Sequence, residues 1–470
     1  MRHGSNGIHG NVLATRRRCI ALSRSDTAIK LSWRPGLCDA FPSAQGGLSD
    51  QPGTSSHHNI GILNSFSRSK GSQPLTVMAA CGALIPRLSE KTTKMKKTTL
   101  AATALLASSV GIQAHAQNSV TLYGIIDDSI QYAHNAGGQS TQVSMVAGQL
   151  SGSRWGLKGS EDLGGGLSAV FRLENGFNAA TGALGQGGRM FGRQAYVGLS
   201  SATYGAFTLG RQYDALHDLV LPVQGNNFLE YFSAPGDVDS GDGTIRFDNT
   251  AKWTSPVWSG LQFMGTYSLG GVAGSPGSGT SWGSGVAYNS GPVHAAAAYL
   301  HIDNGNATTS TRGTTTSGSL FGSVVNSAYS TARSINITRV AGNYVMGPFT
   351  VGGYYSYSEY VPDAASKYRG NEHYNNGSVF ALWQVSVPVQ IELGYDYMKS
   401  GGNSSATYNQ ANLAADYLLS KRTDLYAIVA YGHASGKNGL GNAQAVIADT
   451  VVAAGNASQE LVILGIRHRF

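Results

Sequence analysis

The strongest constraint in this sequence is a regular order of strands, tight turns and long connections between residues 117 and 470. Sixteen segments there alternate apolar and polar residues with the period of two that half-buried β-strands show. Seven tight turns alternate strictly with eight longer connections, so the chain returns to the same side after every second strand. This order predicts antiparallel strands that follow one another around a sheet.

The boundaries of these elements follow from the alternation and from the Gly, Pro, Asn and Ser residues between the segments. We expect strands near 119–133, 149–160, 165–178, 189–201, 205–213, 244–255, 259–268, 282–289, 292–302, 335–346, 348–360, 377–387, 388–399, 408–419, 422–433 and 460–470. Tight turns are expected around Gly164, Tyr204, Pro256, Gly291, Gly347, Val387 and Ser420. The longer connections span 134–148, 179–188, 214–243, 269–281, 303–334, 361–376, 400–407 and 434–459.

The number of strands and the order of loop lengths indicate the fold class. No apolar run in residues 117–470 reaches the 18 residues that a membrane-spanning helix needs. An even number of antiparallel strands, with short turns at one end and long loops at the other, is typical of an outer-membrane barrel. Lipid offers no water to backbone groups, so a sheet that crosses it must close on itself. The sequence therefore predicts an all-β fold, a 16-stranded antiparallel transmembrane β-barrel.

The alternation also assigns side chains to faces. In segment 165–178, Phe171 and Leu173 share one face, which we expect to contact lipid, while Arg172 and Glu174 share the other and form a pair in the lumen. A soluble β-sandwich has the same periodicity with its apolar face inward. The signal sequence described next, the 63 glycines and the alternating loop lengths favour the barrel.

The N-terminal part differs in kind from the rest of the chain. The first 116 residues carry 14 Lys or Arg and 4 Asp or Glu, whereas the remainder carries 19 and 22, so the net charge of +7 is no evidence for nucleic-acid binding by the barrel. Residues 95–116 have a basic start, a short apolar stretch and the A-x-A cleavage site Ala114-His115-Ala116. These are the three parts of a secretory signal peptide. We expect the mature domain to be 117–470, which contains no cysteine.

Residues 1–94 precede this signal and show neither sustained periodicity nor a plausible core. A signal peptide acts near an N-terminus, so we interpret 1–94 as the result of a mis-called translation start upstream of Met95. A genuine, disordered extension is the alternative reading of its composition.

One connection is far longer than the two to five residues that a hairpin needs. Segment 214–243 has no periodicity and carries several carboxylates, while Arg211 and Arg246 lie on the flanking strands. A long acidic loop between basic strands suits a loop that folds into a barrel and faces a basic wall. We therefore expect this third long loop to fold inward and to form the constriction of a water-filled pore.

The last segment ends the chain on an aromatic residue. Counting back by twos from Phe470 gives His468, Ile466, Leu464 and Val462, a mostly apolar face. A chain that ends on a strand without a polar tail is uncommon, because termini are usually poorly ordered. We expect this strand to pair with 119–133 and so remove both sheet edges, with Phe470 acting in barrel closure and assembly.

Several motifs distributed from the first strand to the last carry a resemblance to a known family. They are VTLYGIIDDSI, SRWGLKGSEDLGGGLSAVFRLENGF, RQAYVGLSS, FTLGRQYD, RFDNTAKWTSP, SKRTDLYAIVAY and GIRHRF. Residues 118–470 resemble the general diffusion porins of Gram-negative outer membranes, in the β-proteobacterial branch. The resemblance implies a sixteen-stranded barrel, a homotrimer and an inward-folded third loop, here 214–243.

The resemblance also implies an arginine cluster on the pore wall. Matched by motif, its members are Arg154, Arg211 and Arg246, with Arg193 at a further basic position and Lys158 on the face of Arg154. Arg193 and Arg211 have the parity of lipid-facing neighbours, so a bulge near the strand ends is needed to turn them inward. The alternative for each arginine is a rim salt bridge of little energetic weight.

On the acidic side of the pore, the expected residues are Asp237, Asp239 and Asp242 of the inserted loop. They either face the basic wall or solvate the loop, and the sequence leaves both readings open.

These observations predict a passive outer-membrane porin: a channel for small hydrophilic solutes and ions, favouring anions because basic residues are in excess. A substrate-specific channel, a non-conducting structural barrel and an outer-membrane lipid hydrolase are the alternatives. No catalytic residues are expected, since the one G-x-S-x-G match, at 279–283, lies in a Gly- and Ser-rich loop without a strand-to-helix elbow. No cofactor and no metal are implied, although loop carboxylates can bind Ca²⁺ incidentally.

We expect the protein in the bacterial outer membrane, with lipid, lipopolysaccharide and two further copies of itself as partners. Nucleic acid is not an expected partner, because the tyrosines and tryptophans suit the aromatic girdles of a barrel.

Overall fold

The computed structural model describes residues 118–225, 228, 231–305, 320–448 and 452–470. The expected signal peptide at 95–116 and the segment 1–94 lie outside the described residues, as does Gln117. Within the described ranges the regular secondary structure is mostly β-strand, and no helix there is long and apolar enough to span a membrane.

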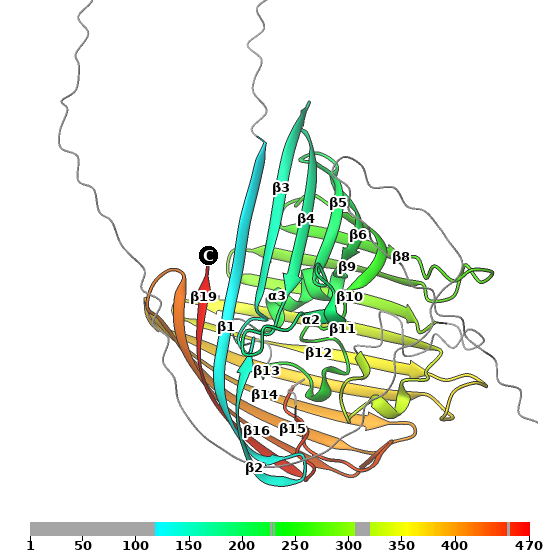
Figure 1. Ribbon diagram of the computed structural model, residues 1–470, viewed down its shortest axis with the longest axis vertical. Coiled ribbons are helices and arrows are strands. Elements are labelled where there is room, and N and C mark those ends of the chain that lie inside the picture. The colour runs from blue at the N-terminus through cyan, green and yellow to red at the C-terminus, as the bar shows by residue number, and fades with distance from the viewer. Residues whose placement is uncertain (1–117, 226–227, 229–230, 306–319, 449–451) are drawn as a thin grey trace, which may run out of the picture. The chain divides into compact units, whose positions relative to one another are not determined.

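The strands follow one another with few interruptions (Figure 1). They are β1 (Ser119–Ala136), β2 (Gln139–Ala147), β3 (Arg154–Gly164), β4 (Leu167–Gly176), β5 (Gln194–Ser201), β6 (Gly205–Gln212), β7 (Phe247–Thr254), β8 (Leu261–Ser268), β9 (Ser281–Ser290), β10 (Val293–Asp303), β11 (Ser334–Met346), β12 (Phe349–Val361), β13 (Glu372–Ser386), β14 (Val389–Gly401), β15 (Thr407–Leu418), β16 (Thr423–Ser435), β17 (Lys437–Asn438), β18 (Gly441–Asn442) and β19 (Ser458–Arg469).

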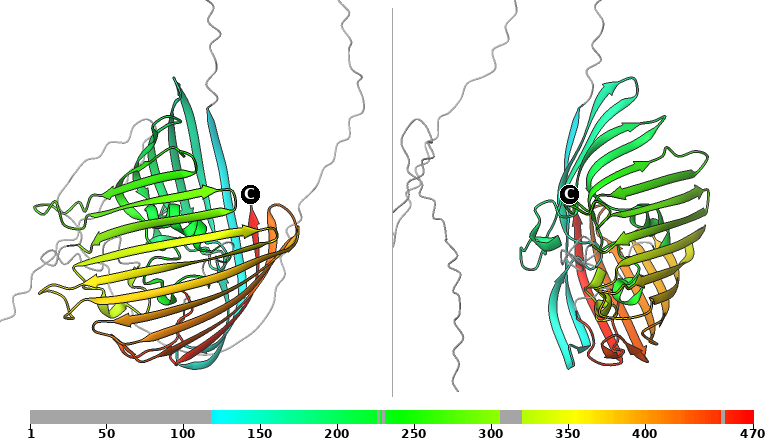
Figure 2. Two further views of the ribbon diagram at one scale, coloured as in Figure 1. Left: turned by 180° about the vertical axis from the view of Figure 1, so that it is seen from behind. Right: turned by 90° about the vertical axis from the view of Figure 1, so that its right-hand side faces the viewer.

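These strands close into a ring. Each strand from β3 to β15 pairs antiparallel with the next, β16 pairs with β19, and β19 pairs with β1. Both β2 and β3 pair with the same edge of β1, β2 along residues 128–136 and β3 along 119–125, so together they form one interrupted strand. The ring therefore has sixteen strand positions, and the prediction of a closed 16-stranded antiparallel barrel is confirmed. The two views of Figure 2 show these tilted strands from further sides.

The structure corrects the first long connection. Segment 134–148 was expected as a loop, but β1 continues to Ala136 and turns back through Gly137 and Gly138 into β2. Both glycines have positive φ angles, 61° and 80°, which are the values that a two-residue hairpin of type I′ needs at its central positions. The chain instead breaks between β2 and β3, at residues 148–153.

The two faces of the barrel differ in polarity as the alternation predicts. Along β12, the outward-facing Val351 and Tyr355 are 38% and 50% exposed, while the inward-facing Ser356 and Ser358 are buried. Large apolar side chains are exposed in the same way on most other strands. Soluble proteins rarely expose an apolar surface of this extent, whereas a barrel in contact with lipid hydrocarbon does.

Three connections pack against the inward-facing side chains. The segment 213–246, here called the long loop, contains the single turns η1 (Leu216–Val220), α3 (Leu221–Gln224) and η3 (Pro235–Asp237). The connection before β11 contributes η5 (Ser327–Tyr329), and the connection after β16 contains β17 and β18. A further connection, between β4 and β5 and separate from these three, contains the single turn α2 (Gly185–Gly188).

Hydrogen bonds and apolar contacts hold these connections in place. The Arg339 guanidinium of β11 donates from Nη1 to Gln224 Oε1 at 3.0 Å, and the Tyr374 hydroxyl of β13 donates to the Val325 carbonyl at 3.0 Å. The fully buried Phe232 of the long loop lies against β14, where a side chain at Gly394 would collide with its ring. The buried apolar core therefore lies inside the barrel, between these loops and strands β7–β16, β19 and β1.

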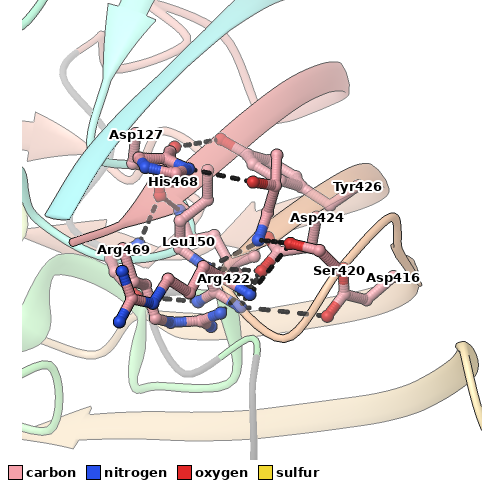
Figure 3. Close-up of polar contacts among 12 residues, drawn as sticks. Asp127, Leu150, Asp416, Ser420, Arg422, Asp424, Tyr426, His468 and Arg469 are labelled. Atoms are coloured by element: carbon pink, nitrogen blue, oxygen red, sulfur yellow. Dashed lines mark hydrogen bonds and ion pairs between the residues drawn. The ribbon is translucent and has the colours of Figure 1, made fainter. Parts of the chain in front are cut away.

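The seam where the last strand, β19, meets the first strand, β1, carries a buried polar network (Figure 3). The Asp127 carboxylate of β1 accepts hydrogen bonds from the Tyr426 hydroxyl at 2.6 Å and from the Leu150 and Ser151 amides at 2.9 and 2.6 Å. One carboxylate thus joins the first strand, the break between β2 and β3, and strand β16.

A second carboxylate in the seam holds two cations. Asp424, which is fully buried, pairs with Arg467 Nε at 3.0 Å and with Arg469 Nη1 at 2.8 Å. Arg467 Nη1 in turn donates to Ser151 Oγ at 2.8 Å. These contacts link β16, β19 and the break between β2 and β3 through charged groups that face inward.

The C-terminal residue completes the closure of the ring. The amide of Phe470 donates to the Gly124 carbonyl at 3.0 Å, and the Gly124 amide donates to the Phe470 carbonyl at 3.0 Å. The Phe470 ring occupies the space beside Gly124, where any side chain would collide with it. The pairing of this strand with β1 is confirmed, and the part of Phe470 in assembly remains a prediction.

Replacement of Asp424 by Ala is expected to lower the free energy of unfolding by about 3 kcal/mol, because it removes the nearer of the two carboxylates beside the buried Arg467 and leaves only Asp416 Oδ2, at 3.8 Å from Nη2. Urea unfolding of the protein in lipid vesicles measures this change. Glu161→Ala, at an exposed position of β3, is the matched control and is expected to change it by less than about 0.5 kcal/mol. Equal effects of the two substitutions would contradict the assigned part of Asp424 in the seam.

Candidate pore constriction

Three arginines lie near one tyrosine, Tyr213, at the start of the long loop. Arg246 Nη2 donates to the Tyr213 hydroxyl at 2.7 Å, and its guanidinium lies 4.8 Å from the centre of the Tyr213 ring. Burial raises the pKa of the Tyr213 phenol, but the positive charges of Arg246, Arg193 and Arg154 outweigh it and hold this pKa below its usual value. The structure therefore brings Arg154, Arg193 and Arg246 together; we call them the arginine cluster.

The cluster forms because each arginine lies at the loop-side end of a strand. Arg154 is the first residue of β3, Arg193 directly precedes β5, and Arg246 directly precedes β7. Arg193 therefore lies outside the regular alternation that pointed it toward lipid. It is only 7% exposed, and its Nε lies 2.9 Å from Glu174 Oε1 on the inward face of β4.

Arg211 is turned inward by a bulge. The register between β6 and β7 shifts between Gly210 and Gln212, and Gly210 has a φ angle of 138°, which is strained for any residue with a side chain. The Arg211 guanidinium donates to the Gly192 carbonyl at 2.6 Å and to Asp248 Oδ1 at 2.6 Å. It therefore lies on the same wall as the cluster, but its charge is paired.

The remaining basic residues extend the wall toward the short turns. Arg172 Nη2 lies 2.7 Å from Glu174 Oε2, and its Nε donates to the Tyr123 hydroxyl at 2.7 Å. The Lys158 ammonium lies 5.5 Å from the centre of the same tyrosine ring. Glu174 thus shares its charge between Arg172 and Arg193, and Lys158 is exposed with no acidic partner within the described ranges.

Two of the expected acidic residues lie elsewhere. Asp239 is fully buried, and its Oδ1 lies 3.7 Å from Arg339 Nη2 on β11. Asp237, 3% exposed, accepts hydrogen bonds from the Asp242 amide at 2.9 Å and from the Thr244 hydroxyl. Both carboxylates therefore hold the long loop in its conformation and in its position inside the barrel. This role differs from the expectation that they line the pore.

Asp242 has a different environment from these two. It is half-buried. Burial and the charge of Arg193 lower the pKa of the Arg246 guanidinium below its usual value, and the Asp242 carboxylate is among the charges that oppose this shift. Of the three expected loop carboxylates, Asp242 is the one that the structure brings into the field of the arginine cluster.

No sequence pattern had assigned a role to the other charged residues near the start of the long loop. Lys252 Nζ on β7 lies 2.7 Å from Asp218 Oδ2, and His217 Nδ1 lies 2.8 Å from Asp218 Oδ1. Burial raises the pKa of Asp218, but the hydrogen bond from His217 and the charge of Lys252 bring it well below its usual range. Asp214 accepts a hydrogen bond from the Leu216 amide at 2.6 Å at the start of η1. An Asp before a helical turn was the available signal for this last contact.

Asp248 on β7 was also missed. Its carboxylate pairs with Arg211 at 2.6 Å and with Arg189 Nη2 at 3.4 Å. Its position in the RFDNTAKW motif gave no indication that it neutralises part of the wall. Among the described side chains of this wall, basic groups still exceed acidic ones.

Comparisons with known proteins agree with this architecture. The family described as Gram-negative porin matches residues 100–437. An outer membrane porin protein of Bordetella pertussis is 33% identical over 426 residues, which cover 80% of this chain and all of that protein. Outer membrane porin protein 32 of Delftia acidovorans is 29% identical with the same coverage.

Solved structures share the fold. An anion-selective porin from Comamonas acidovorans superposes with a TM-score of 0.59 at 22% identity, covering 75% of this chain and all of that one. The trimer form of OmpT, an outer membrane protein of Vibrio cholerae, gives a TM-score of 0.54 at 15% identity, covering 75% of this chain and 99% of that one. With the family match and the relatives above, these findings establish that the chain belongs to the Gram-negative porin family of bacterial outer-membrane β-barrels, whose members are channels and not enzymes.

Proposed function

We propose that this porin is a weakly selective channel in which the arginine cluster favours anions. The observation that carries this proposal is the grouping of Arg154, Arg193 and Arg246 around Tyr213, beside the root of the long loop. Of the acidic groups near the cluster, Glu174 already shares its charge with Arg172. The cluster therefore keeps an excess of positive charge.

The long loop supplies the narrowing in this proposal. It crosses from β6 to the inward faces of β10, β11 and β12, where Arg339 and Tyr360 hold its backbone. The passage for solutes is then the space between the loop and the wall formed by β3–β7. Fixed charges beside a narrow aqueous gap raise the local concentration of counter-ions, and the size of the gap limits the solutes that pass.

Acidic groups on the wall determine the strength of the preference for anions. Asp248 neutralises Arg211 and partly neutralises Arg189, while Asp242 acts on Arg246. The resulting preference for anions is weak rather than absolute, as expected for a channel through which small polar solutes diffuse.

Assembly into a homotrimer in contact with lipopolysaccharide is part of the same proposal. The apolar outer face supports contact with lipid, and a trimer form is recorded for the Vibrio cholerae protein of similar fold. Chemical cross-linking of the purified protein in mild detergent, followed by denaturing electrophoresis, measures the number of subunits.

Replacement of both Arg154 and Arg246 by Gln is expected to shift the reversal potential under a salt gradient toward cations, because it removes two positive charges from the cluster. Planar-bilayer recording of single channels measures this shift. Lys421→Gln, in the exposed turn between β15 and β16, is the control and should leave the reversal potential unchanged. An unaltered reversal potential in the double variant would exclude these arginines as the source of selectivity.

Replacement of Asp248 by Asn is expected to move the reversal potential in the opposite direction, toward stronger anion preference, because it releases the charges of Arg211 and Arg189. The same bilayer recordings measure it. A shift toward cations would show that Asp248 does not neutralise the wall.

The anion preference of the unmodified channel is expected to fall as salt rises from about 0.1 M to about 1 M, since the screening length falls from ~10 Å to ~3 Å. Reversal potentials measured at a constant concentration ratio across this range give the preference. A preference that does not depend on salt would indicate selection by contact with the ion, and would count against a field set by the arginine cluster.

A further inference from the structure

A cavity of about 270 Å³ lies between α3 of the long loop and the inward faces of β9–β13. Pro222 and Val223 of α3 line one side of the cavity, and Asn289, His294 and Asn343 line the wall side. These wall residues flank the tight turns after β9 and β11, so the cavity lies toward the end of the barrel that carries the short turns.

None of the described residues that line the cavity carries a charged side chain. Its polar groups are two amides, an imidazole and the Thr350 hydroxyl, and the Phe380 ring supplies an aromatic surface. The nearby Arg339 is fully buried, and its guanidinium is bonded to Gln224 and to the Asp239 carbonyl. The chemistry of the cavity therefore differs from that of the arginine cluster on β3–β7.

Two hydrogen bonds position the lining groups and leave others available. Asn343 Nδ2 donates to the Val223 carbonyl at 3.1 Å, which ties the wall to the long loop. His294 Nδ1 lies 2.9 Å from Asn289 Oδ1, so a neutral imidazole donates from Nδ1 and keeps Nε2 as an acceptor. Within the described part of the chain, Asn289 Nδ2, Asn343 Oδ1 and the Thr350 hydroxyl make no further hydrogen bond. They present donors and acceptors to a solute in the cavity.

Gly352 on β12 keeps the aromatic surface open. A side chain at this position would collide with the Asn343 side chain and with the Phe380 ring, at 2.6 and 2.7 Å. The absence of a Cβ atom therefore keeps the amide and the ring next to each other.

We propose that this cavity is a binding site for a neutral, hydroxyl-bearing solute of about monosaccharide size on its way through the lumen. This inference rests on the proposed channel function and adds a solute class to it. Ligand pockets for drug-sized molecules measure about 300–1,000 Å³, so 270 Å³ favours a smaller molecule. Uncharged donors and acceptors match hydroxyl groups, and an aromatic ring packs against the apolar face of a sugar.

Single-channel recording with glucose tests the site. The inward-facing Asn289 and Val345 at the cavity are exposed, so the cavity opens to the lumen near the short turns. A glucose molecule bound there narrows the lumen. Glucose is therefore expected to reduce the open-channel current saturably, beyond the linear effect of trimethylamine N-oxide at matched viscosity. In the double variant Asn289→Leu/Thr350→Val the half-saturating glucose concentration is expected to rise about tenfold, from the loss of two hydrogen bonds. Neither residue holds the long loop in place.

The variant Arg154→Gln/Arg246→Gln is the control: its ion preference changes, while glucose is expected to act on it as on the unmodified channel. A linear, unsaturable effect of glucose on an otherwise conducting, anion-preferring channel would overturn the solute site and leave the proposed function standing. A protein without conductance would instead overturn the proposed function. Equal action of glucose on the Asn289→Leu/Thr350→Val channel would overturn the location of the site.

Thiol modification gives a second measurement that does not depend on the double variant. Residues 117–470 contain no cysteine, so with Cys19, Cys38 and Cys81 replaced by Ser, Thr350→Cys provides the one thiol of the protein and places it in the cavity. Glucose is expected to slow the reaction of this thiol with a neutral maleimide. A thiol at Lys158, on the opposite wall, is expected to react at the same rate with and without glucose, and equal protection at both positions would contradict a local site.

Discussion

The pairing of β1 with β19 is the interaction on which the rest of this structure depends. Ten consecutive residue pairs, from Ile125–Arg469 to His134–Glu460, join the two ends of the sheet. In lipid an unpaired backbone group costs several kcal/mol, so an open edge of this length is not tolerated. Closure then lets the apolar side chains face outward, and it frees the inner face for polar groups and for loops. The Asp127 and Asp424 networks lie beside this seam and hold the break between β2 and β3 against it.

The interior of the barrel is divided between packing and charge. Along β9–β16, the long loop and the connections before β11 and after β16 cover the wall and bury an apolar core. Along β3–β7, the wall keeps its arginines beside Tyr213 and Glu174. The root of the long loop contributes Tyr213 and Arg246 to the charged side, while its distal part packs on the opposite side. In the proposed channel, one segment thus determines both the narrowing of the pore and part of the charge beside it.

Much of the fold was predictable because the membrane imposes a period of two on every strand. All seven tight turns lie where Gly, Pro and Ser residues indicated them, and the strand positions around the ring agree with the alternation. The first hairpin was missed because its Gly137-Gly138 turn lies inside a Gly- and Ser-containing stretch that resembles a loop. The break at 148–153 depends on contacts with Asp127 that are distant in sequence.

The candidate site was predictable only in part. Motif matching assigned Arg154, Arg211, Arg246 and Arg193 to one wall, although the parity rule alone pointed Arg193 and Arg211 toward lipid. One lies just before its strand and the other follows a bulge at Gly210, and neither feature has a periodic signal. The places of Asp237 and Asp239 depend on how the long loop folds back on itself and on Arg339, which lies a hundred residues further along the chain. Composition cannot reveal such contacts.

The most direct test of this account is a measurement of which side chains face lipid. Residues 117–470 lack cysteine, so with Cys19, Cys38 and Cys81 replaced by Ser, single spin labels can be placed at Leu157, Val197 and Leu199 and, separately, at Lys158 and Ser160. In lipid vesicles, the first three are expected to be accessible to oxygen and shielded from a water-soluble relaxation agent, while the last two show the reverse. Equal accessibility of both sets to the aqueous agent, or shielding of Lys158 and Ser160 from it, would contradict a closed barrel with an apolar exterior and an aqueous interior.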